Sequence, residues 1–243
     1  MSLIIINVTL QNHDKITSKT VNILNNKQLI ITEDGSHSFY LPDLDETYHS
    51  KHGAIQEANH VFIKSGFEQI ECVEFAILEI GFGTGLNCFI TYLEAKKNNK
   101  IIKYTGVEAF PLKEEEIEHL NYVSELKAEK FQNIFDQIHH IEWNIETKID
   151  NQFYLEKQLL SFDKIQDKNK YNLIYFDAFG ARVQPELWTE AIFKKMYQAL
   201  LPNGILVTYS AKGSVRRAML VVGFKVEKIP GPPGKREMLR AIK

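Results

Sequence analysis

The sequence predicts an α/β fold in which helices cover a mostly parallel sheet. The apolar run Ala76–Ile80 leads directly into three glycines, and apolar residues then recur at helical spacing over 86–93. A second apolar run, 172–176, ends in Asp177 and precedes an amphipathic helix pattern over 189–200. Strand patterns that alternate with helical patterns indicate βαβ units, and therefore parallel strands.

The glycine segment reads Glu79-Ile-Gly-Phe-Gly-Thr-Gly85. A strand that ends in glycines lets the backbone approach a ligand, and the next helix offers unpaired N–H groups to an anion. An ordinary turn between strand and helix needs only one glycine, so three favour a nucleotide-type site. A dinucleotide fingerprint needs glycine at its sixth position, where Leu86 stands. The spacing instead resembles motif I of the S-adenosylmethionine-dependent methyltransferases, whose loop holds the methionine end of the cofactor.

A second acidic residue ends the next predicted strand, Ile101–Glu108. Glu108 follows the glycines by about one βαβ unit, where its carboxylate can accept hydrogen bonds from both ribose hydroxyls. A solvated strand end is the alternative for Glu108 taken alone. Together with the glycine segment, the ligand-binding role is favoured.

The composition is that of an ordinary globular protein, with 243 residues, 44% hydrophobic and 25% charged. Cys72 and Cys88 have no C-x-x-C spacing, which indicates structural thiols in a reducing compartment. His49, His52 and His60 lack a supporting carboxylate pattern, so we expect no metal. No uncharged apolar run approaches the ~18 residues of a membrane span, and the N-terminus has no signal-peptide pattern, so we expect no membrane contact and a cytoplasmic protein.

Positive charge is concentrated at the C-terminal end. The chain has a formal net charge of −2, yet the segment from Lys212 onward holds nine basic and two acidic residues. Such a segment is either a solvated face or a contact surface for a polyanion such as RNA.

The N-terminal residues 1–50 are predicted to form a small β extension, and 51–243 the main domain. Short β-like runs cover Leu3–Val8, Thr20–Leu24, Leu29–Thr32 and Ser38–Leu41, and a helix is expected over 54–62. In the middle of the chain we expect one helix over 113–130 and a second near 131–138. Strands over 140–149 and 152–156 and a short helical piece over 159–162 are expected to follow.

The remaining elements surround Asp177. A buried strand over 172–179 carries this residue at its carboxyl end, where open α/β sheets bind ligands. Helices are expected over 189–200 and 212–222. Strands are expected over 204–210, 224–229 and 237–242.

Several stretches resemble one family, the methyltransferase part of the tRNA wobble-uridine enzymes that make 5-methylaminomethyl-2-thiouridine (the MnmC N-terminal and MnmD-like family). The stretches are Tyr48-His-Ser-Lys-His-Gly53 with Glu57 and His60-Val-Phe62, Glu79 to Asn87, Glu108-Ala-Phe-Pro-Leu112, Phe176-Asp-Ala-Phe179 with Pro185-Glu-Leu-Trp188, Val215-Arg-Arg217, and Gly234-Lys-Arg-Glu-Met238.

This resemblance implies a Rossmann-like class I fold, with a mostly parallel seven-stranded sheet that ends in an antiparallel hairpin. It implies methyl transfer from S-adenosyl-L-methionine to 5-aminomethyl-2-thiouridine in tRNA, by a stand-alone enzyme without the flavin oxidase domain and linked to a separate enzyme that installs the aminomethyl group. The implied cofactor residues are Glu79, Gly81, Phe82, Gly83, Thr84, Gly85, Asn87, Glu108, Ala109 and Asp177. The implied substrate residues are Tyr48, His52, Phe179, Arg182, Trp188, Arg216, Arg217, Lys235 and Arg236.

The sequence departs from the family pattern at two places. Relatives usually carry Ala-Pro and a basic residue after the Asp-Ala-Phe motif, where this chain reads Gly180-Ala-Arg182-Val, so Arg182 is expected to replace that base. Relatives tend to carry an Asp after the third strand, where this chain reads Lys157 to Ser161. Gln158 or Ser161 would then bind the adenine edge.

Asp177 is the expected catalytic residue. A protonated amine cannot attack a methyl group, so the site needs an anion that orients the ammonium and eases its proton loss. We expect mostly positioning from Asp177, because a solvated carboxylate has too low a pKa to be a strong base. Phe179 and Trp188 are candidates for stacking on the flipped base, with a core position the alternative for Trp188. Arg216, Arg217, Lys235 and Arg236 would contact phosphates.

Two other functions remain open from the sequence. A small-molecule amine N-methyltransferase or aminopropyltransferase on the same fold suits the acidic composition, although the basic C-terminal segment argues against it. A non-catalytic module that binds the cofactor is the third possibility, because the 180–183 loop is altered.

Overall fold

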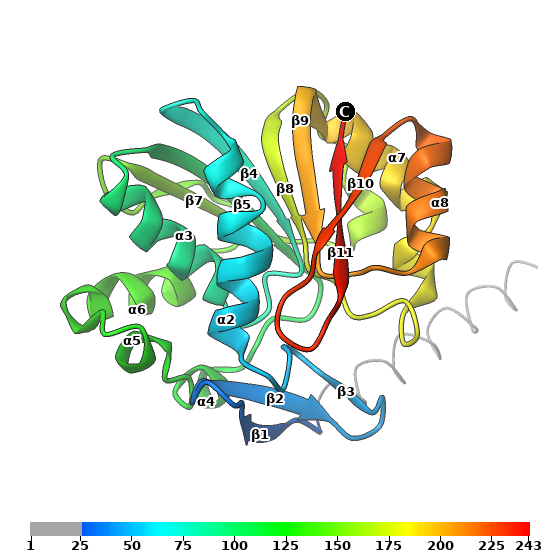
Figure 1. Ribbon diagram of the computed structural model, residues 1–243. Coiled ribbons are helices and arrows are strands. Elements are labelled where there is room, and N and C mark those ends of the chain that lie inside the picture. Colours follow the sequence, from blue (N-terminus) through cyan, green and yellow to red (C-terminus); the bar gives the residue numbers. More distant parts are fainter. Residues whose placement is uncertain (1–25) are drawn as a thin grey trace, which may run out of the picture.

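The computed structural model describes residues 26–243, in which eight strands form one central sheet with helices on both faces (Figure 1). The strands are β4 Glu74–Ile80, β5 Ile101–Glu108, β6 Thr147–Lys148, β7 Phe153–Leu159, β8 Tyr171–Phe176, β9 Leu200–Thr208, β10 Lys225–Pro230 and β11 Glu237–Ile242. Their order across the sheet is β10-β11-β9-β8-β4-β5-β7-β6. Five adjacent strands, β9 to β7 in this order, are parallel, and β11 runs antiparallel to both β9 and β10.

The predicted fold class is confirmed. The sheet has one strand more than the seven that the family resemblance implies, because the two-residue strand β6 adds to its edge through antiparallel pairing with β7. Strand β8 is buried along nearly its whole length because helices cover it from both sides.

Two helical layers enclose the sheet. One consists of α2 (Ala54–Ala58), which continues as the π-helix η1 (Asn59–Lys64), together with α3 (Leu86–Lys97) and α6 (Gln132–His140); the other consists of α7 (Glu190–Ala199) and α8 (Gly213–Val222). Within residues 26–243, no helix is both long and apolar enough to cross a membrane. The shorter helices are η2 Phe67–Gln69, α4 Glu114–Ile117, α5 Tyr122–Glu125, η3 Glu129–Phe131, η4 Phe162–Lys164 and η5 Pro185–Trp188.

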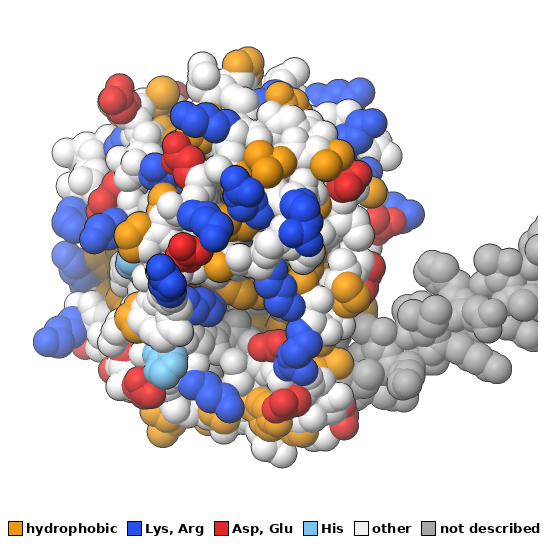
Figure 2. Space-filling model, turned by 45° about the vertical axis from the view of Figure 1, so that its right-hand side comes forward, with side chains coloured by type: hydrophobic (Ala, Val, Ile, Leu, Met, Phe, Trp, Pro, Cys, Tyr) orange, Lys and Arg blue, Asp and Glu red, His pale blue; other side chains and the backbone are white. Residues whose placement is uncertain are grey.

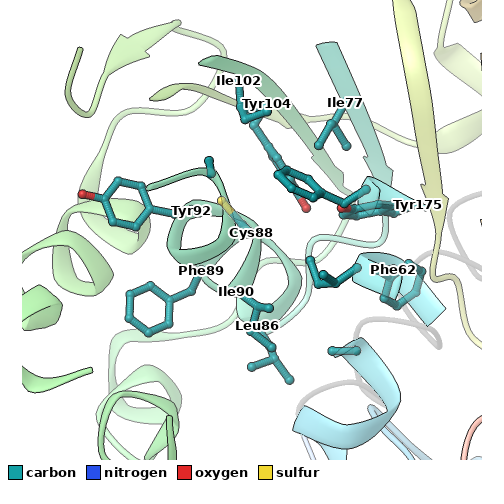
Figure 3. Close-up of a cluster of buried hydrophobic side chains, with 14 of the residues drawn as sticks. Phe62, Ile77, Leu86, Cys88, Phe89, Ile90, Tyr92, Ile102, Tyr104 and Tyr175 are labelled. Atoms are coloured by element: carbon teal, nitrogen blue, oxygen red, sulfur yellow. The ribbon is translucent and has the colours of Figure 1, made fainter. Parts of the chain in front are cut away.

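The core on the α3 side is rich in aromatic side chains. Figure 3 shows Cys88 of α3 on the side of Tyr104 of β5, with Tyr175 of β8 facing Phe62 of η1. The ring centroids of Phe62 and Tyr175 are 5.0 Å apart. Aromatic pairs of this kind contribute beyond the area they bury, so α3 and η1 are fixed against the sheet.

A second, three-stranded antiparallel sheet consists of β1 (Gln28–Ile31), β2 (His37–Leu41) and β3 (Glu46–Thr47). It confirms the strands expected near 29–32 and 38–41, whereas those expected over Leu3–Val8 and Thr20–Leu24 lie outside the described residues. Asn121 joins this sheet to the main body, because its side chain accepts a hydrogen bond from the His37 N–H (2.7 Å) and donates one to the Gly35 carbonyl (3.0 Å). In Figure 1 the small sheet lies at the lower end of the molecule.

The short helical piece expected over 159–162 is displaced to η4, because β7 continues to Leu159. Two sequence predictions between β5 and β7 are wrong. The helix expected over 113–130 is divided into α4, α5 and η3, and the division falls where Asn121 binds the small sheet and where Lys127 has a φ of 52°. The strand expected over 140–149 is reduced to β6, because α6 extends to His140 and Asn144 turns the chain with a φ of 64°. In both segments tertiary contacts override the local pattern.

The sheet topology determines where the site lies. The chain adds β5 and β7 on one side of β4 and then returns to add β8 and β9 on the other. The crevice at such a reversal, beyond the carboxyl ends of the strands, is where open α/β sheets bind ligands. The loops that follow β4, β5, β7 and β8 all begin at this edge.

Gly106 of β5 gives a test of how tightly this edge is packed. A Cβ atom added at Gly106 would lie 2.3 Å from Cδ2 of the buried Phe82 in the glycine loop. Gly106→Ala should therefore destabilise the protein by about 1–3 kcal/mol in denaturant unfolding, the usual cost of overpacking. Gly213→Ala is the control, since its new methyl group would meet only the flexible Arg217 side chain at 3.2 Å. Equal stability of Gly106→Ala and the wild type would contradict this packing.

Candidate functional site

Four loops at the carboxyl edge of the sheet enclose a cavity of about 500 Å³. This volume lies within the range of small-molecule sites. The loops contribute the glycine segment after β4, Glu108 after β5, Ser161 to Asp163 after β7, and Asp177 after β8. The small N-terminal sheet and the following segment close the cavity with Glu46, Thr47, Tyr48, His49 and Ser50.

The glycine segment adopts a conformation that other residues would resist. Gly81, Gly83 and Gly85 have φ values of 88°, 50° and 71°. A Cβ atom at Gly81 would also lie 2.6 Å from the carbonyl oxygen of Asp177. Glycine at position 81 therefore lets the loops after β4 and β8 touch, while Gly85 begins α3 with its N-terminus at the cavity.

Glu108 is fixed by the backbone around it. Its Oε2 accepts a hydrogen bond from the Gly83 N–H (3.0 Å), and its Oε1 accepts two from the N–H groups of Ala109 and Phe110 (2.9 Å each). A carboxylate has about four acceptor sites, so these three bonds hold the side chain while leaving Oε2 able to accept from a ligand hydroxyl. One acceptor site of Glu108 thus remains for a ligand hydroxyl, whereas the sequence analysis expected Glu108 to accept from both ribose hydroxyls.

A buried hydrogen-bond network lies under the glycine loop. The Asn87 Nδ2 group donates to Oε1 of Glu79 (2.9 Å) and to Oδ2 of Asp177 (2.8 Å), and the Tyr104 hydroxyl donates to Oε2 of Glu79 (2.8 Å). Burial raises the pKa of Glu79 well above its usual value, against the opposing effect of these two donors. Glu79 is fully buried and lies outside the cavity lining, so it acts on the site through Asn87.

The pKa of Asp177 is raised from 3.8 to about 7. Desolvation is the largest cause and the negative charge of Glu57 adds to it, while the Asn87 hydrogen bond and the Lys235 charge act in the opposite direction. The sequence prediction of a solvated carboxylate is therefore wrong. A group with a pKa near 7 can accept a proton from an ammonium far more effectively at neutral pH.

The wall facing Asp177 combines charge and aromatic surface. Lys235 Nζ lies 2.7 Å from Oε1 of Glu57 and 4.1 Å from the ring centroid of Tyr209. The rings of Tyr48 and Phe179 meet edge to face at 5.1 Å. Glu57 and Tyr209 were not predicted as site residues, although Tyr209 follows the carboxyl end of β9, where the strand-end rule would have pointed to it.

A half-buried histidine lies beside the glycine loop. His49 Nδ1 is 2.9 Å from the Ser38 hydroxyl, and His49 Nε2 is 3.3 Å from the Thr84 hydroxyl. Desolvation lowers the pKa of His49 to about 4, so its ring is neutral at physiological pH. Its place in the lining was also not predicted.

The loop after β7 differs from the sequence prediction. Strand β7 continues to Leu159, so the turn that faces the cavity consists of Ser161, Phe162 and Asp163. Gln158 lies outside the lining, and its amide instead donates to Glu156 (2.9 Å). Asp163, which was not among the predicted residues, lines the cavity beside Ser161.

The structure brings together most of the predicted cofactor residues and few of the predicted substrate residues. Those that line the cavity are Gly81, Phe82, Gly83, Thr84, Asn87, Glu108, Ala109, Ser161, Asp177, Tyr48, Phe179 and Lys235. Those that lie outside the lining are Glu79, Gly85, Gln158, His52, Arg182, Trp188, Arg216, Arg217 and Arg236.

Three of the outlying residues have other partners. Trp188 is buried and its Nε1–H donates to the Phe179 carbonyl (2.8 Å), which supports the core alternative. Arg182 binds Glu46 (3.3 Å) and the Asp45 carbonyl, so it pins the altered loop to the small sheet. His52 lies 3.1 Å from Glu33 on the surface.

Two basic side chains of the C-terminal segment are available to a ligand at the surface. Arg217 on α8 and Arg236 in the β10–β11 loop are exposed. In Figure 2, which turns the C-terminal strands and α8 toward the reader, Lys and Arg side chains gather on this face. Lys235 is the exception, because its ammonium points inward to Glu57.

Comparison with known proteins gives similar sequences and folds. The tRNA 5-methylaminomethyl-2-thiouridine biosynthesis bifunctional proteins MnmC of Hydrogenovibrio crunogenus and Leptospira interrogans are 30% and 31% identical to it over 80% of this chain. The chain spans about a third of the length of these relatives.

Two solved structures share the fold. MNMC2 from Aquifex aeolicus matches with a TM-score of 0.72 at 24% identity, over 89% of this chain and 69% of that one. Spermidine synthase from Thermotoga maritima matches with a TM-score of 0.50 at 15% identity, over 85% and 68%.

A family model described as S-adenosyl-L-methionine-dependent methyltransferase matches residues 118–243, which is more than half of the chain. This match agrees with the glycine loop, with Glu108 and with the cavity at the reversal point of the sheet. The chain therefore belongs to the S-adenosyl-L-methionine-dependent methyltransferases.

Proposed function

We propose that this protein methylates the primary amine of 5-aminomethyl-2-thiouridine at the wobble position of tRNA, with S-adenosyl-L-methionine as the methyl donor. The observation that carries the proposal is Asp177, a carboxyl group with a pKa near 7 beside the cofactor loop. The similarity to MnmC proteins and the basic C-terminal face support tRNA as the substrate. In this proposal the protein acts in the cytoplasm, after a separate enzyme has installed the aminomethyl group. Residues 51–243 are its catalytic domain.

The cofactor residues fit an adenosyl group with a charged methionine end. Glu108 would accept from a ribose hydroxyl, Asp163 and Ser161 would meet the adenine edge, and the N-terminus of α3 would face the methionine carboxylate. The bound cofactor supplies a methyl group on a sulfonium.

The residues around Asp177 prepare the amine. The Asp177 carboxylate attracts the ammonium, and at a pKa near 7 it accepts one ammonium proton, so the nitrogen lone pair becomes free to attack. The freed amine would then accept the methyl group that the bound sulfonium supplies, and the electron pair of the broken S–C bond would stay on sulfur. Asn87 keeps the Asp177 carboxylate oriented from below throughout.

Removing the charge of Asp177 tests the catalytic role. Asp177→Asn should lower methyl transfer by roughly 10²-fold or more while S-adenosylhomocysteine still binds. The assay is nucleoside mass spectrometry of tRNA that carries the unmethylated nucleoside, with spermidine and putrescine as small-molecule amines in parallel. Methylation of the polyamines in place of tRNA would favour the small-molecule function, and wild-type activity of Asp177→Asn would remove Asp177 from the mechanism.

The same substitution predicts a pH-dependent change in stability. The pKa of Asp177 is higher in the folded protein than its ordinary 3.8, so its contribution to stability is full below about pH 4 and is lost as the pH rises through about 7. As the pH rises from about 4 to 7, the free energy of unfolding of Asp177→Asn should therefore increase relative to that of the wild type, by about 1 kcal/mol or more. Thermal unfolding over this range measures the difference, and a constant difference would show an ordinary pKa.

Substitutions of Asp163 and Gln158 test which of the two residues binds the adenine edge. Asp163→Ala removes a carboxylate from the cavity lining, and Gln158→Ala removes a side chain that lies outside it. Calorimetry with S-adenosylhomocysteine should show binding weakened about tenfold for Asp163→Ala, the effect of one lost hydrogen bond to a charged group, and unchanged for Gln158→Ala. The opposite ranking would restore Gln158 as the adenine residue.

The RNA surface is tested by salt dependence. Arg217→Gln and Arg236→Gln each remove an exposed cation from the basic face, and each should flatten the slope of log affinity for tRNA against log salt by up to about one unit. Lys97→Gln at the end of α3 is the control, because its side chain is 71% exposed and lies on another helical layer. Unchanged slopes in both arginine variants would show that this face is solvated and does not contact RNA.

A further inference from the structure

The loop between β10 and β11 is fixed against α2 and the residues on either side of it, so that Lys235 points into the cavity. His60 Nε2 lies 2.8 Å from the Pro230 carbonyl at the start of the loop. Gly234 has a φ of 82°, and a Cβ atom added there would lie 2.2 Å from the His52 ring. Figure 1 shows the loop descending beside α2 toward the small sheet. Lys235 follows Gly234 and reaches inward to Glu57 of α2.

The contacts of the Lys235 ammonium are those that any alkylammonium would make. It donates to Oε1 of Glu57 at 2.7 Å and lies over the Tyr209 ring at 4.1 Å. A carboxylate and an aromatic face are the two groups that recognise such cations. The ammonium has three N–H donors, and among the described residues its only hydrogen bond is the one to Glu57. The Lys235 side chain is 35% exposed. Exchange with another ammonium therefore breaks few contacts.

The charge of the cavity favours such an exchange. Lys235 is the one lysine or arginine in the described lining, against six carboxyl groups: Glu46, Glu57, Glu108, Asp163, Asp177 and Glu186. Glu57 is a nearly buried carboxylate whose other oxygen accepts the Ser50 N–H (2.9 Å). Leaving it unpaired would be strongly unfavourable, so Lys235 can leave only when another cation replaces it.

This cation position lies beside the proton acceptor. The Tyr209 hydroxyl donates to the carbonyl of Ala178, the residue after Asp177 (2.8 Å). The charges of both Glu57 and Lys235 act on the Asp177 carboxyl group. An ammonium held by Glu57 and Tyr209 is therefore close enough to Asp177 for their charges to interact.

We propose that Glu57 and the ring face of Tyr209 form the subsite for the ammonium group of the substrate, which Lys235 occupies in the free protein and vacates when the substrate binds. The identification of this ammonium as that of the aminomethyl uridine rests on the proposed function. The exchange keeps Glu57 paired at every stage. The released Lys235 then lies beside the exposed Arg236, where a phosphate of the RNA can pair with it.

Ethylammonium chloride is a suitable probe, because it presents an ammonium without RNA. Binding is measured by NMR titration of protein saturated with S-adenosylhomocysteine, with sodium chloride at the same ionic strength as the reference. Lys235→Met should bind ethylammonium at least about tenfold more tightly than the wild type, since the competing cation is gone and Glu57 needs a partner. Lys235→Met/Glu57→Gln should lose this gain.

Lys228→Met is the matched control, because Lys228 pairs with Glu237 on the surface of the same hairpin (2.8 Å). It should bind ethylammonium like the wild type. Equal binding by Lys235→Met and the wild type, or a gain that survives Glu57→Gln, would overturn the subsite.

A kinetic measurement separates this inference from the proposed function and covers the case in which Lys235→Met does not fold. Glu57→Gln, with Lys235 in place, should raise KM for aminomethyl-uridine tRNA about tenfold or more and leave S-adenosylhomocysteine binding unchanged. If the wild type methylates this tRNA and Glu57→Gln has an unchanged KM, the subsite is wrong and the function stands. If ethylammonium binds as expected and the wild type does not methylate tRNA, the function is wrong and the subsite stands.

Discussion

The site depends on one side chain, Asn87, which donates to two carboxyl groups from below the cavity. Glu79 lies on the buried side of this amide and Asp177 on the cavity side. Because Asn87 is in the first turn of α3, the position of Asp177 is tied to the same helix that begins at the glycine loop. The glycine loop and Asp177 are therefore held in one rigid arrangement, as the proposed methyl transfer requires.

The surroundings of this network explain how a carboxyl group could accept a proton from the ammonium form of an amine. In water an aspartate is too weak a base to take a proton from an ammonium. Here desolvation and the nearby charge of Glu57 raise the pKa of Asp177 to about 7, and the ion pair of Lys235 with Glu57 keeps the opposite wall paired until a cation enters. A cavity lined by six carboxyl groups, in a protein with exposed arginines, suits the proposed substrate, a cationic group carried on a polyanion.

Much of this could be predicted from the sequence, because strand ends and glycines are local signals. The glycine loop, Glu108 and Asp177 each follow a recognisable strand, and the parallel arrangement then places them together. The inward direction of Lys235 could not be predicted, since it depends on how the β10–β11 loop packs on α2 and η1. The contact of this loop with His60 of η1 joins residues that are 170 positions apart. The pKa of Asp177 likewise depends on desolvation and on the charge of Glu57, which comes from a distant segment. Asp163 was missed for a simpler reason, because β7 is longer than its apolar pattern indicated.

The central claim is that the fold converts Asp177 into a base that operates near neutral pH. The direct measurement is the titration of its carboxyl carbon by ¹³C NMR, with the signal assigned by its absence in Asp177→Asn. A midpoint near 7 is the predicted result. A midpoint near the ordinary value of 3.8 would contradict the account, because the site would then hold the ammonium without easing its proton loss.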